Sequence, residues 1–267
     1  MKHLSKERRK IAREIRDSHT YLFLDFDGTL TPIRRHPGKV RLGKRIYEIL
    51  QKLAGTRDVD IAIISGRSLK EIKRLVGVKN IIYVGNHGLE VYGAGADFKL
   101  AEAVKGRRTI TALSRKLRQE LRFFRGVIVE DKGLTLSVHF RMAKEKDIQK
   151  IVQAFEKVVR PYKKEGKVKV TGGKKVWEIR PPVEWDKGRM IKRLLKEKRQ
   201  RLKKRVIPFC MGDDRTDEDA FGRLGNDGYT VKITKNPGEA STARYYLRNV
   251  REVSMFLRDI YLLRKGE

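Results

Sequence analysis

The chain has 267 residues, enough to bury a sizeable core in one large or two modest domains, which excludes a peptide or a simple coil. Its 64 Lys and Arg outnumber 33 Asp and Glu, and the formal net charge of +31 indicates an anionic partner such as a phosphorylated metabolite, nucleic acid or anionic lipid. A single cysteine, Cys210, excludes an intrachain disulfide, and no apolar run suits a signal peptide or a membrane span of about 20 residues, so we expect a soluble cytoplasmic protein.

The chain begins with a predicted short amphipathic helix over residues 4–16. The strand that follows, residues 21–24 (YLFL), is apolar throughout, which is typical of a parallel strand buried on both faces. It ends in Asp25 and Asp27, and Gly28 allows a sharp turn. Residues two apart in an extended chain project to the same side, so both carboxylates can face one reacting group. A capped turn is the alternative interpretation of this motif.

The same pattern recurs further along the chain. Predicted buried strands at residues 60–64, 81–84 and 206–211 also end in small, polar or charged residues, and predicted helices at residues 43–54 and 69–76 separate the first ones. Strands that alternate with helices predict right-handed crossovers and a parallel sheet. One edge of that sheet would then collect all four strand endings in a composite site.

Between these core segments the alternation of single strands and helices gives way to predicted pairs of strands. Residues 127–140 and 168–180 each have the pattern of two antiparallel strands, and a helix is predicted between them at residues 144–159. We therefore predict an α/β protein with a parallel-sheet core, residues 1–88 and 184–267, and an inserted α+β domain, residues 89–183.

Two further helices complete the predicted core, at residues 188–204 and 250–263. Nine of the fourteen residues 192–205 are Lys or Arg, but no aromatic residues are interleaved with them. A solvated helix face is favoured, and nucleic acid would bind only nonspecifically through charge. The charged fraction of 36% resembles that of thermophile proteins with surface ion-pair networks.

The residues at the strand ends are suited to phosphoryl transfer. We predict that Asp25 is the nucleophile, because an ionised carboxylate can attack phosphorus and hold the group covalently. Asp27 would protonate the leaving alkoxide and later take a proton from the attacking water. Ser65 would donate a hydrogen bond to a phosphate oxygen, and Lys187 would contribute positive charge. Alternatively, Ser65 is a helix N-cap and Lys187 a surface lysine.

Mg²⁺ is the predicted cofactor, because paired carboxylates repel one another and hard oxygen ligands suit this ion. We expect it on Asp25, on the backbone carbonyl of Asp27 and on Asp213. Asp214 and Asp217 would support these ligands from behind, although Asp217 could simply cap the following helix.

Six motifs then show a resemblance to a known family: DFDGTLTPI from Asp25, SGR from Ser65, GNHGLE from Gly85, EIRPP from Glu178, DKG from Asp186 and GDDRTDEDAF from Gly212. Together they resemble the haloacid-dehalogenase superfamily and, within it, the trehalose-6-phosphate phosphatases. The resemblance implies a Rossmann-like core with an inserted cap, and Mg²⁺-dependent hydrolysis through an aspartyl-phosphate.

For the sugar, the family's cap residues map onto Lys132, Arg141, Lys174 and Glu178, and Arg67 of the SGR motif joins the expected substrate contacts. The expected partner is a phosphorylated disaccharide, bound by a monomer. Two alternatives stay open: a related phosphatase acting on mannosyl-phosphoglycerate or sucrose phosphate, and a polyanion-binding protein on a phosphatase fold.

Overall fold

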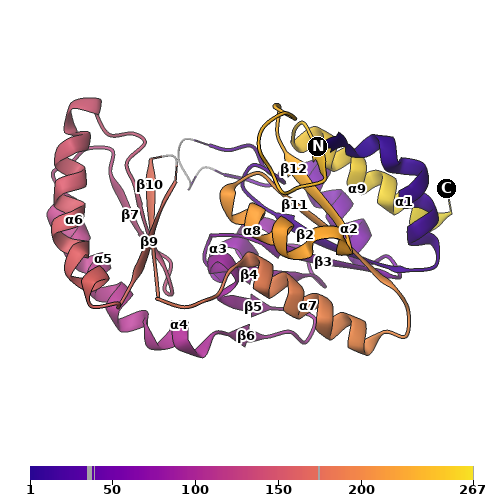
Figure 1. Ribbon diagram of the computed structural model, residues 1–267, viewed down its shortest axis with the longest axis horizontal. Coiled ribbons are helices and arrows are strands. Elements are labelled where there is room, and N and C mark those ends of the chain that lie inside the picture. The colour runs from indigo at the N-terminus through magenta and orange to yellow at the C-terminus, as the bar shows by residue number, and fades with distance from the viewer. Residues whose placement is uncertain (35–37, 39, 174, 267) are drawn as a thin grey trace. The chain divides into compact units, whose positions relative to one another are not determined.

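The computed structural model describes residues 1–34, 38, 40–173 and 175–266. The chain forms two compact units (Figure 1). The core unit consists of residues Met1–Phe98 and Trp185–Glu267, and the inserted unit of residues Lys99–Glu184.

A nine-stranded sheet runs through the core unit in the order β1-β13-β12-β11-β2-β3-β4-β5-β6, as far as the described residues show. All neighbours from β1 to β4 are parallel, and β5 pairs antiparallel with β4. The strands are β1 (Lys2–His3), β2 (His19–Asp25), β3 (Val59–Ile64), β4 (Ile82–Gly85), β5 (Glu90–Tyr92), β6 (Phe98–Lys99), β11 (Val206–Gly212), β12 (Tyr229–Ile233) and β13 (Tyr245–Leu247).

Strand β2 lies inside this sheet, between β11 and β3, and every one of its residues is buried. Its side chains alternate between two apolar clusters. Leu22 and Leu24 pack with buried residues of four helices on one face: α1 (Arg8–Arg16), α2 (Lys44–Ala54), α3 (Leu69–Val76) and α9 (Val250–Lys265). Tyr21 and Phe23 pack with buried residues of α7 (Lys187–Arg201) and α8 (Arg215–Leu224). Helices therefore cover both faces of the sheet, which is why the YLFL run has no polar alternation.

Side-chain caps fix where several helices begin. Ser68 accepts a hydrogen bond at the start of α3, Asp186 at α7, Asn249 at α9, and Asp214 forms a capping box with Asp217 at α8. The core unit also has short 3₁₀ turns at Leu4–Glu7, Asn86–Gly88 and Gly225–Asp227.

The inserted unit contains a four-stranded antiparallel sheet in the order β7-β8-β10-β9. One face of this sheet packs on two helices, through Leu136, Val138 and Ile179 among others. The elements of this unit are α4 (Ala101–Lys105), α5 (Arg107–Leu121), β7 (Ile128–Asp131), β8 (Leu136–His139), α6 (Ile148–Lys164), β9 (Lys169–Gly173) and β10 (Val176–Arg180), with a 3₁₀ turn at Glu145–Asp147.

The predicted fold class is confirmed: the core sheet is predominantly parallel and lies between helices. The boundary expected at residue 89 differs from the structure, which keeps β5 in the core sheet because Tyr83 and Gly85 pair with Tyr92 and Glu90. Helices α4 and α5 and strands β1, β5, β6, β12 and β13 were not predicted from the sequence.

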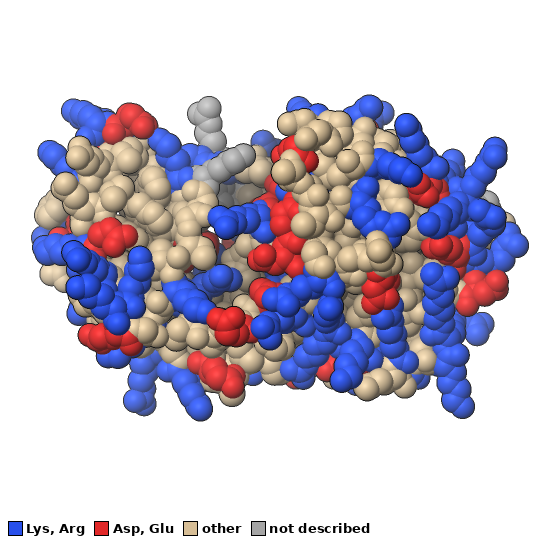
Figure 2. All heavy atoms as spheres, viewed as in Figure 1, with Lys and Arg blue, Asp and Glu red and all other residues tan. Residues whose placement is uncertain are grey.

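Lys and Arg side chains cover much of the face seen in Figure 2. Among the described residues, no helix is both long enough and apolar enough to cross a membrane.

Candidate active site

The register of the core sheet places the ends of β2, β3 and β11 side by side at one edge of the sheet. Asp25 pairs with Ile64, the residue before Ser65, and Leu24 pairs with Met211, two residues before Asp213. All three side chains therefore lie at the carboxyl end of neighbouring parallel strands, where α/β sheets bind ligands.

Lys187, the first residue of α7, lies between two of the buried carboxylates. Its Nζ donates to Oδ1 of Asp25 at 2.8 Å and to Oδ1 of Asp217 at 3.0 Å. The exposed fractions of the three residues are 2%, 6% and 2%. Burial alone would lower the pKa of Lys187, but the two carboxylates hold that pKa well above its usual value. Lys187 is thus a fixed positive charge and not the surface lysine of the alternative interpretation.

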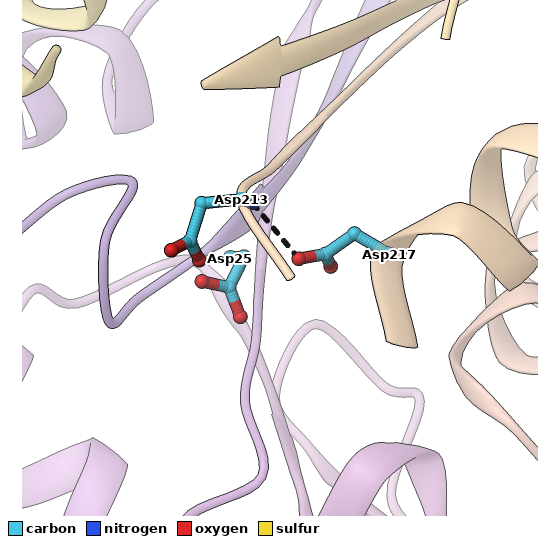
Figure 3. A group of neighbouring side chains, drawn as sticks. All are labelled: Asp25, Asp213 and Asp217. Carbon is cyan, nitrogen blue, oxygen red and sulfur yellow. Dashed lines mark hydrogen bonds between the residues drawn. The ribbon is translucent and has the colours of Figure 1, made fainter. Parts of the chain in front are cut away.

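Three carboxylates converge here, as Figure 3 shows for Asp25, Asp213 and Asp217. Each offers an oxygen, and these atoms lie within 4.8 Å of one another. Burial and the charges of nearby Asp214 and Asp213 raise the pKa of Asp25 to about 8, against the opposing effect of Lys187. Burial and the charges of Asp217 and Asp214 likewise raise the pKa of Asp213 to about 7.

A cation would relieve the repulsion between these carboxylates, and their hard oxygen donors fit a divalent metal ion. The Asp213 side chain also packs closely against Gly28, in the turn after β2. A Cβ added at Gly28 would lie only 2.1 Å from Asp213 Oδ2. Gly28 has a φ of +91°, which further restricts this position to glycine.

Asp217 differs from the other two carboxylates in that its oxygens already have donors. Oδ1 accepts from Lys187, and Oδ2 accepts from the backbone N–H groups of Asp213 and Asp214. Asp214 in turn caps α8 by accepting from the N–H groups of Thr216 and Asp217. Asp25 and Asp213 are therefore the better candidates for metal ligands, and Asp214 and Asp217 shape the loop that presents them.

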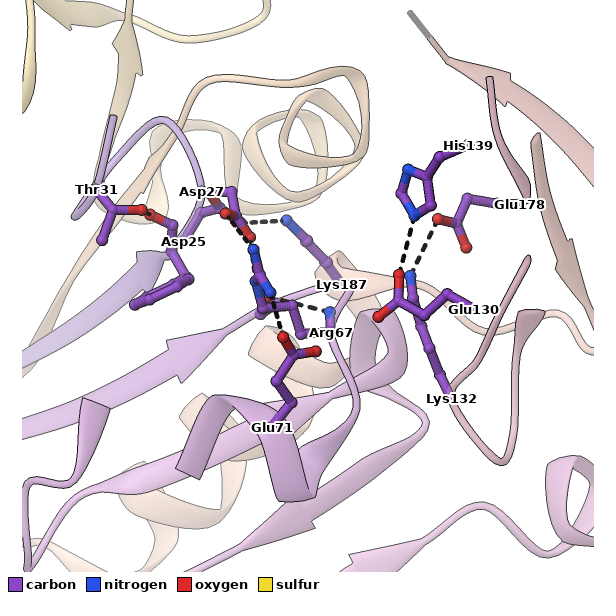
Figure 4. A network of polar contacts seen from close by, with 12 residues as sticks. Asp25, Asp27, Thr31, Arg67, Glu71, Glu130, Lys132, His139, Glu178 and Lys187 are labelled. Atoms are coloured by element: carbon purple, nitrogen blue, oxygen red, sulfur yellow. Dashed lines mark hydrogen bonds and ion pairs between the residues drawn. The ribbon is translucent and has the colours of Figure 1, made fainter. Parts of the chain in front are cut away.

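Asp27 has a partner that the sequence did not indicate. Arg67 donates from Nε to Asp27 Oδ2 at 2.7 Å and from Nη2 to Oδ1 at 2.9 Å, and its Nη1 pairs with Glu71 (Figure 4). This is a bidentate guanidinium–carboxylate pair, the strong and directional form of such contacts. The structure thus brings Arg67 to the predicted acid–base residue, and its role as a substrate contact remains a prediction.

Ser65 is buried beside this pair, with an exposed fraction of 1%. Its Oγ accepts from the backbone N–H of Arg67 at 3.2 Å, which fixes the turn after β3. The N-cap of α3 is Ser68, so the helix-cap interpretation of Ser65 is wrong. The turn also requires glycine next to it, because a Cβ at Gly66 would lie 2.4 Å from the His87 ring.

In the inserted unit, two of the four expected sugar contacts meet. Lys132 Nζ donates to Glu178 Oε1 at 3.1 Å, and both side chains are largely buried. Arg141 is exposed in the turn after β8. Lys174 lies outside the described residues.

Three residues near Glu178 were missed by sequence reasoning. Ser137 Oγ donates to Glu178 Oε1 at 2.6 Å, and His139 Nε2 lies 2.9 Å from Glu130 Oε2 (Figure 4). Strand alternation could have placed Glu130 of β7 and Lys132, which directly follows β7, on one side of the chain, but only the pairing of β7, β8 and β10 brings all these residues together.

On this fold, a nucleophile candidate paired with a buried lysine and flanked by carboxylates that fit a metal ion defines a phosphatase of the haloacid-dehalogenase superfamily. Comparisons with known proteins narrow the class. The trehalose-phosphatase family model matches residues 23–251.

The relatives agree with that match. The chain is 32% identical to the probable trehalose-phosphate phosphatase D of Arabidopsis thaliana over 94% of its own length and 69% of that protein. It is 34% identical to the trehalose 6-phosphate phosphatase RA3 of Zea mays over 90% and 69% of the two chains. The C-terminal domain of the C. albicans trehalose-6-phosphate phosphatase has the same fold, with a TM-score of 0.77, 24% identity and coverage of 97% and 96%. The chain belongs to the trehalose-phosphatase family, a family of enzymes.

Proposed function

We propose that this chain hydrolyses trehalose 6-phosphate to trehalose and inorganic phosphate through a covalent aspartyl-phosphate on Asp25. The observation that supports this most directly is the buried contact between Asp25 Oδ1 and Lys187 Nζ at 2.8 Å, at the carboxyl end of the parallel sheet. A carboxylate held there by a fixed cation is oriented for attack, and the same cation offsets the charge of the phosphate.

In the first step, a carboxylate oxygen of Asp25 forms a bond to phosphorus, and the bond from phosphorus to the sugar oxygen breaks. Asp27 gives its proton to that oxygen as trehalose leaves. In the second step, water attacks the phosphorus and loses its proton to Asp27, and the bond to Asp25 breaks. Each step leaves Asp27 ready for the next.

Arg67 limits how Asp27 can do this. A guanidinium group carries only donors, and here it donates to both oxygens of Asp27. A protonated Asp27 has less capacity to accept at its hydroxyl oxygen, so one of the two hydrogen bonds from Arg67 weakens while Asp27 carries the proton for the leaving group. The pair as it stands suits the carboxylate form, which accepts the proton of the attacking water.

Mg²⁺ is the metal we propose, held by Asp25 and Asp213 with the backbone carbonyl of Asp27 as the third protein ligand. It would offset the negative charge of the phosphate and of the carboxylates around it. Ser65 would hydrogen-bond a phosphate oxygen from its place directly after β3.

We further propose that the inserted unit chooses the sugar through Lys132, Arg141, Lys174 and Glu178, while the core unit performs the reaction. The names of the curated relatives favour trehalose phosphate over the other phosphosugars.

The test is phosphate release from trehalose 6-phosphate, sucrose 6-phosphate and mannosyl-3-phosphoglycerate, each with Mg²⁺ and with a chelator. We expect the highest kcat/KM for trehalose 6-phosphate and no turnover after chelation. A clear preference for another member of the panel would overturn the substrate assignment, and full activity in chelator would overturn the metal requirement.

A further inference from the structure

We propose that Ser137 is a positioning residue that sets which oxygen of Glu178 is presented to the sugar. The inference rests on the proposed function, because it concerns how the inserted unit recognises its substrate. It begins with strand register: Glu178 of β10 pairs with Ser137 of β8, and Ser137 pairs with Glu130 of β7. Directly paired residues have their side chains on the same face of the sheet, about 5 Å apart at Cβ.

That face is the polar one. The residues on either side of Ser137 and Glu178 are Leu136, Val138, Trp177 and Ile179, and all four belong to the apolar cluster formed with α5 and α6. Since successive side chains point to opposite faces of a sheet, Ser137 and Glu178 lie on the face away from these helices. Ser137 is nevertheless fully buried, and the Glu178 side chain is 19% exposed.

The two oxygens of Glu178 have different surroundings. Oε1 accepts from both Ser137 Oγ, at 2.6 Å, and Lys132 Nζ, at 3.1 Å. Oε2 is buried, and among the described residues it has no hydrogen-bond partner. A buried carboxylate oxygen without a donor is unfavourable, so this atom is where an incoming donor gains most. A sugar hydroxyl supplies such a donor.

Ser137 decides which oxygen of Glu178 remains available to accept a hydrogen bond from the sugar. A carboxylate rotates readily about its last torsion, because that torsion has only broad minima. The short hydrogen bond from Ser137 adds a second, rigid donor to Oε1, since a serine hydroxyl on a strand has far fewer rotamers than the long Lys132 side chain. Glu178 is thereby held before the substrate arrives, which reduces the entropy cost of binding. It therefore accepts from the sugar with one oxygen, whereas a free carboxylate could accept from two hydroxyls.

The decisive experiment measures kcat/KM for trehalose 6-phosphate and for p-nitrophenyl phosphate in Ser137→Ala. Without the hydrogen bond from Ser137, the sugar itself must order the Glu178 carboxylate when it binds, so we expect a fall of about tenfold for the disaccharide phosphate. The aryl phosphate lacks the hydroxyls and should be hydrolysed at the wild-type rate. Ser137→Thr keeps the hydroxyl and should restore activity on trehalose 6-phosphate.

Thr171→Ala is the matched control. Thr171 of β9 pairs with Glu178 from the other side, in the same row of the sheet, and is exposed. It also loses a hydroxyl, but none of the described contacts joins that hydroxyl to Glu178, so both substrates should be hydrolysed as in the wild type. If Ser137→Ala does not fold, Ser137→Cys makes the same comparison, because it leaves no cavity and replaces a strong donor by a weak one.

A double variant separates positioning from an independent role. Glu178→Ala alone should cost up to about a hundredfold on trehalose 6-phosphate, the upper range for the loss of one hydrogen bond to a charged group. Adding Ser137→Ala to it should cost nothing more, because the serine acts only through Glu178. Multiplied losses in the double variant, equal losses on both substrates, or an unchanged Ser137→Ala would each overturn the inference.

Failure of the proposed function has a different signature. A wild-type enzyme that ignores trehalose 6-phosphate and hydrolyses another phosphosugar contradicts the substrate assignment. The same variants measured on that other substrate still decide whether Ser137 positions Glu178.

Discussion

The two ends of the core sheet shift the pKa of their carboxylates in opposite directions. At the carboxyl end, Asp25 and Asp213 are buried beside further carboxylates, and the pKa of each is raised, to about 8 and about 7. At the amino end, Asp58 and Asp60 lie beside Lys204, Lys198 and His19, and the pKa of each is lowered. The paired strands β2 and β3 run from one end to the other, so the contrast lies along a single pair of strands.

The contrast shows that the carboxyl end of the sheet, and not the amino end, contains charges that lower the stability of the fold. Buried like charges oppose folding unless a cation or a ligand relieves them, and they are typical of functional sites. Carboxylates surrounded by cations at the other end favour folding. Removing a carboxylate at the carboxyl end should therefore lower activity without lowering stability. Removing one at the amino end should lower stability and leave activity unchanged.

The largest expected effect follows from Asp25→Asn. The amide cannot attack phosphorus, so phosphate release should fall by at least about a thousandfold on every substrate. Because the variant also removes a buried charge, its free energy of unfolding in chelator should equal or exceed that of the wild type. Assays of phosphate release and urea unfolding check both parts. A correctly folded variant that kept a tenth of the activity would show that Asp25 is not the nucleophile.

Lys187→Met should have the largest effect on stability. Removing one partner of a buried ion pair leaves Asp25 and Asp217 without their cation, which typically costs about 3–5 kcal/mol. Urea unfolding in chelator measures this loss. Lys192→Met, an exposed lysine on the same helix, is the control and should change little. Adding Asp25→Asn to Lys187→Met should recover part of the stability, and a further loss in that double variant would contradict the charge argument.

How far the sequence predicts this site depends on how local each contact is. Asp25, Ser65 and Asp213 follow apolar runs directly, and parallel strands necessarily bring such endings to one edge. Lys187 begins a helix, so its approach to Asp25 follows from the same architecture once α7 packs on the sheet.

The contacts that the sequence did not reveal depend on register or on long side chains. Ser137 meets Glu178 across 41 positions of the chain, and nothing in either strand alone fixes which residues pair. Arg67 could equally have extended toward a ligand, because its side chain is long, and only the position of Asp27 after the neighbouring strand β2 decides that the two residues pair. The missed strands β12 and β13 lie beyond β11 toward the edge of the sheet. They have five and three residues, too few for a clear run of apolar residues.

Addition of Mg²⁺ should stabilise the protein through the carboxyl end alone. A ligand at about 100 times its Kd adds about 2.7 kcal/mol to the free energy of unfolding. We expect a gain of this order for the wild type, measured by thermal unfolding with Mg²⁺ against chelator, and little gain for Asp213→Asn. Asp17→Asn makes the same change of charge at an exposed aspartate and should keep the full response. An equal response of Asp213→Asn would exclude Asp213 as a metal ligand.

The smallest effect is expected at the amino end, from Asp60→Asn. Asp60 Oδ2 lies 2.8 Å from His19 Nε2 and 2.5 Å from Lys198 Nζ. Burial raises the pKa of Asp60, but these two hydrogen bonds and the accompanying charges outweigh it and lower the pKa below its usual value. The folded state therefore favours the ionised carboxylate. Its contribution is complete above the unfolded pKa of about 4 and is lost as the pH falls through the lower folded pKa.

At pH 7 the asparagine variant should accordingly be less stable than the wild type by about 1 kcal/mol, the usual size of a partly buried pair. The gap should close as the pH falls below about 4, because the wild type then loses what the variant never had. Urea unfolding at a series of pH values measures the gap, and Asp17→Asn corrects for the shared change in net charge. Activity should be unchanged, since the substitution leaves the carboxyl end of the sheet intact. A gap that widened in acid would mean that Asp60 opposes folding, and the two ends of the sheet would then not differ in the way described.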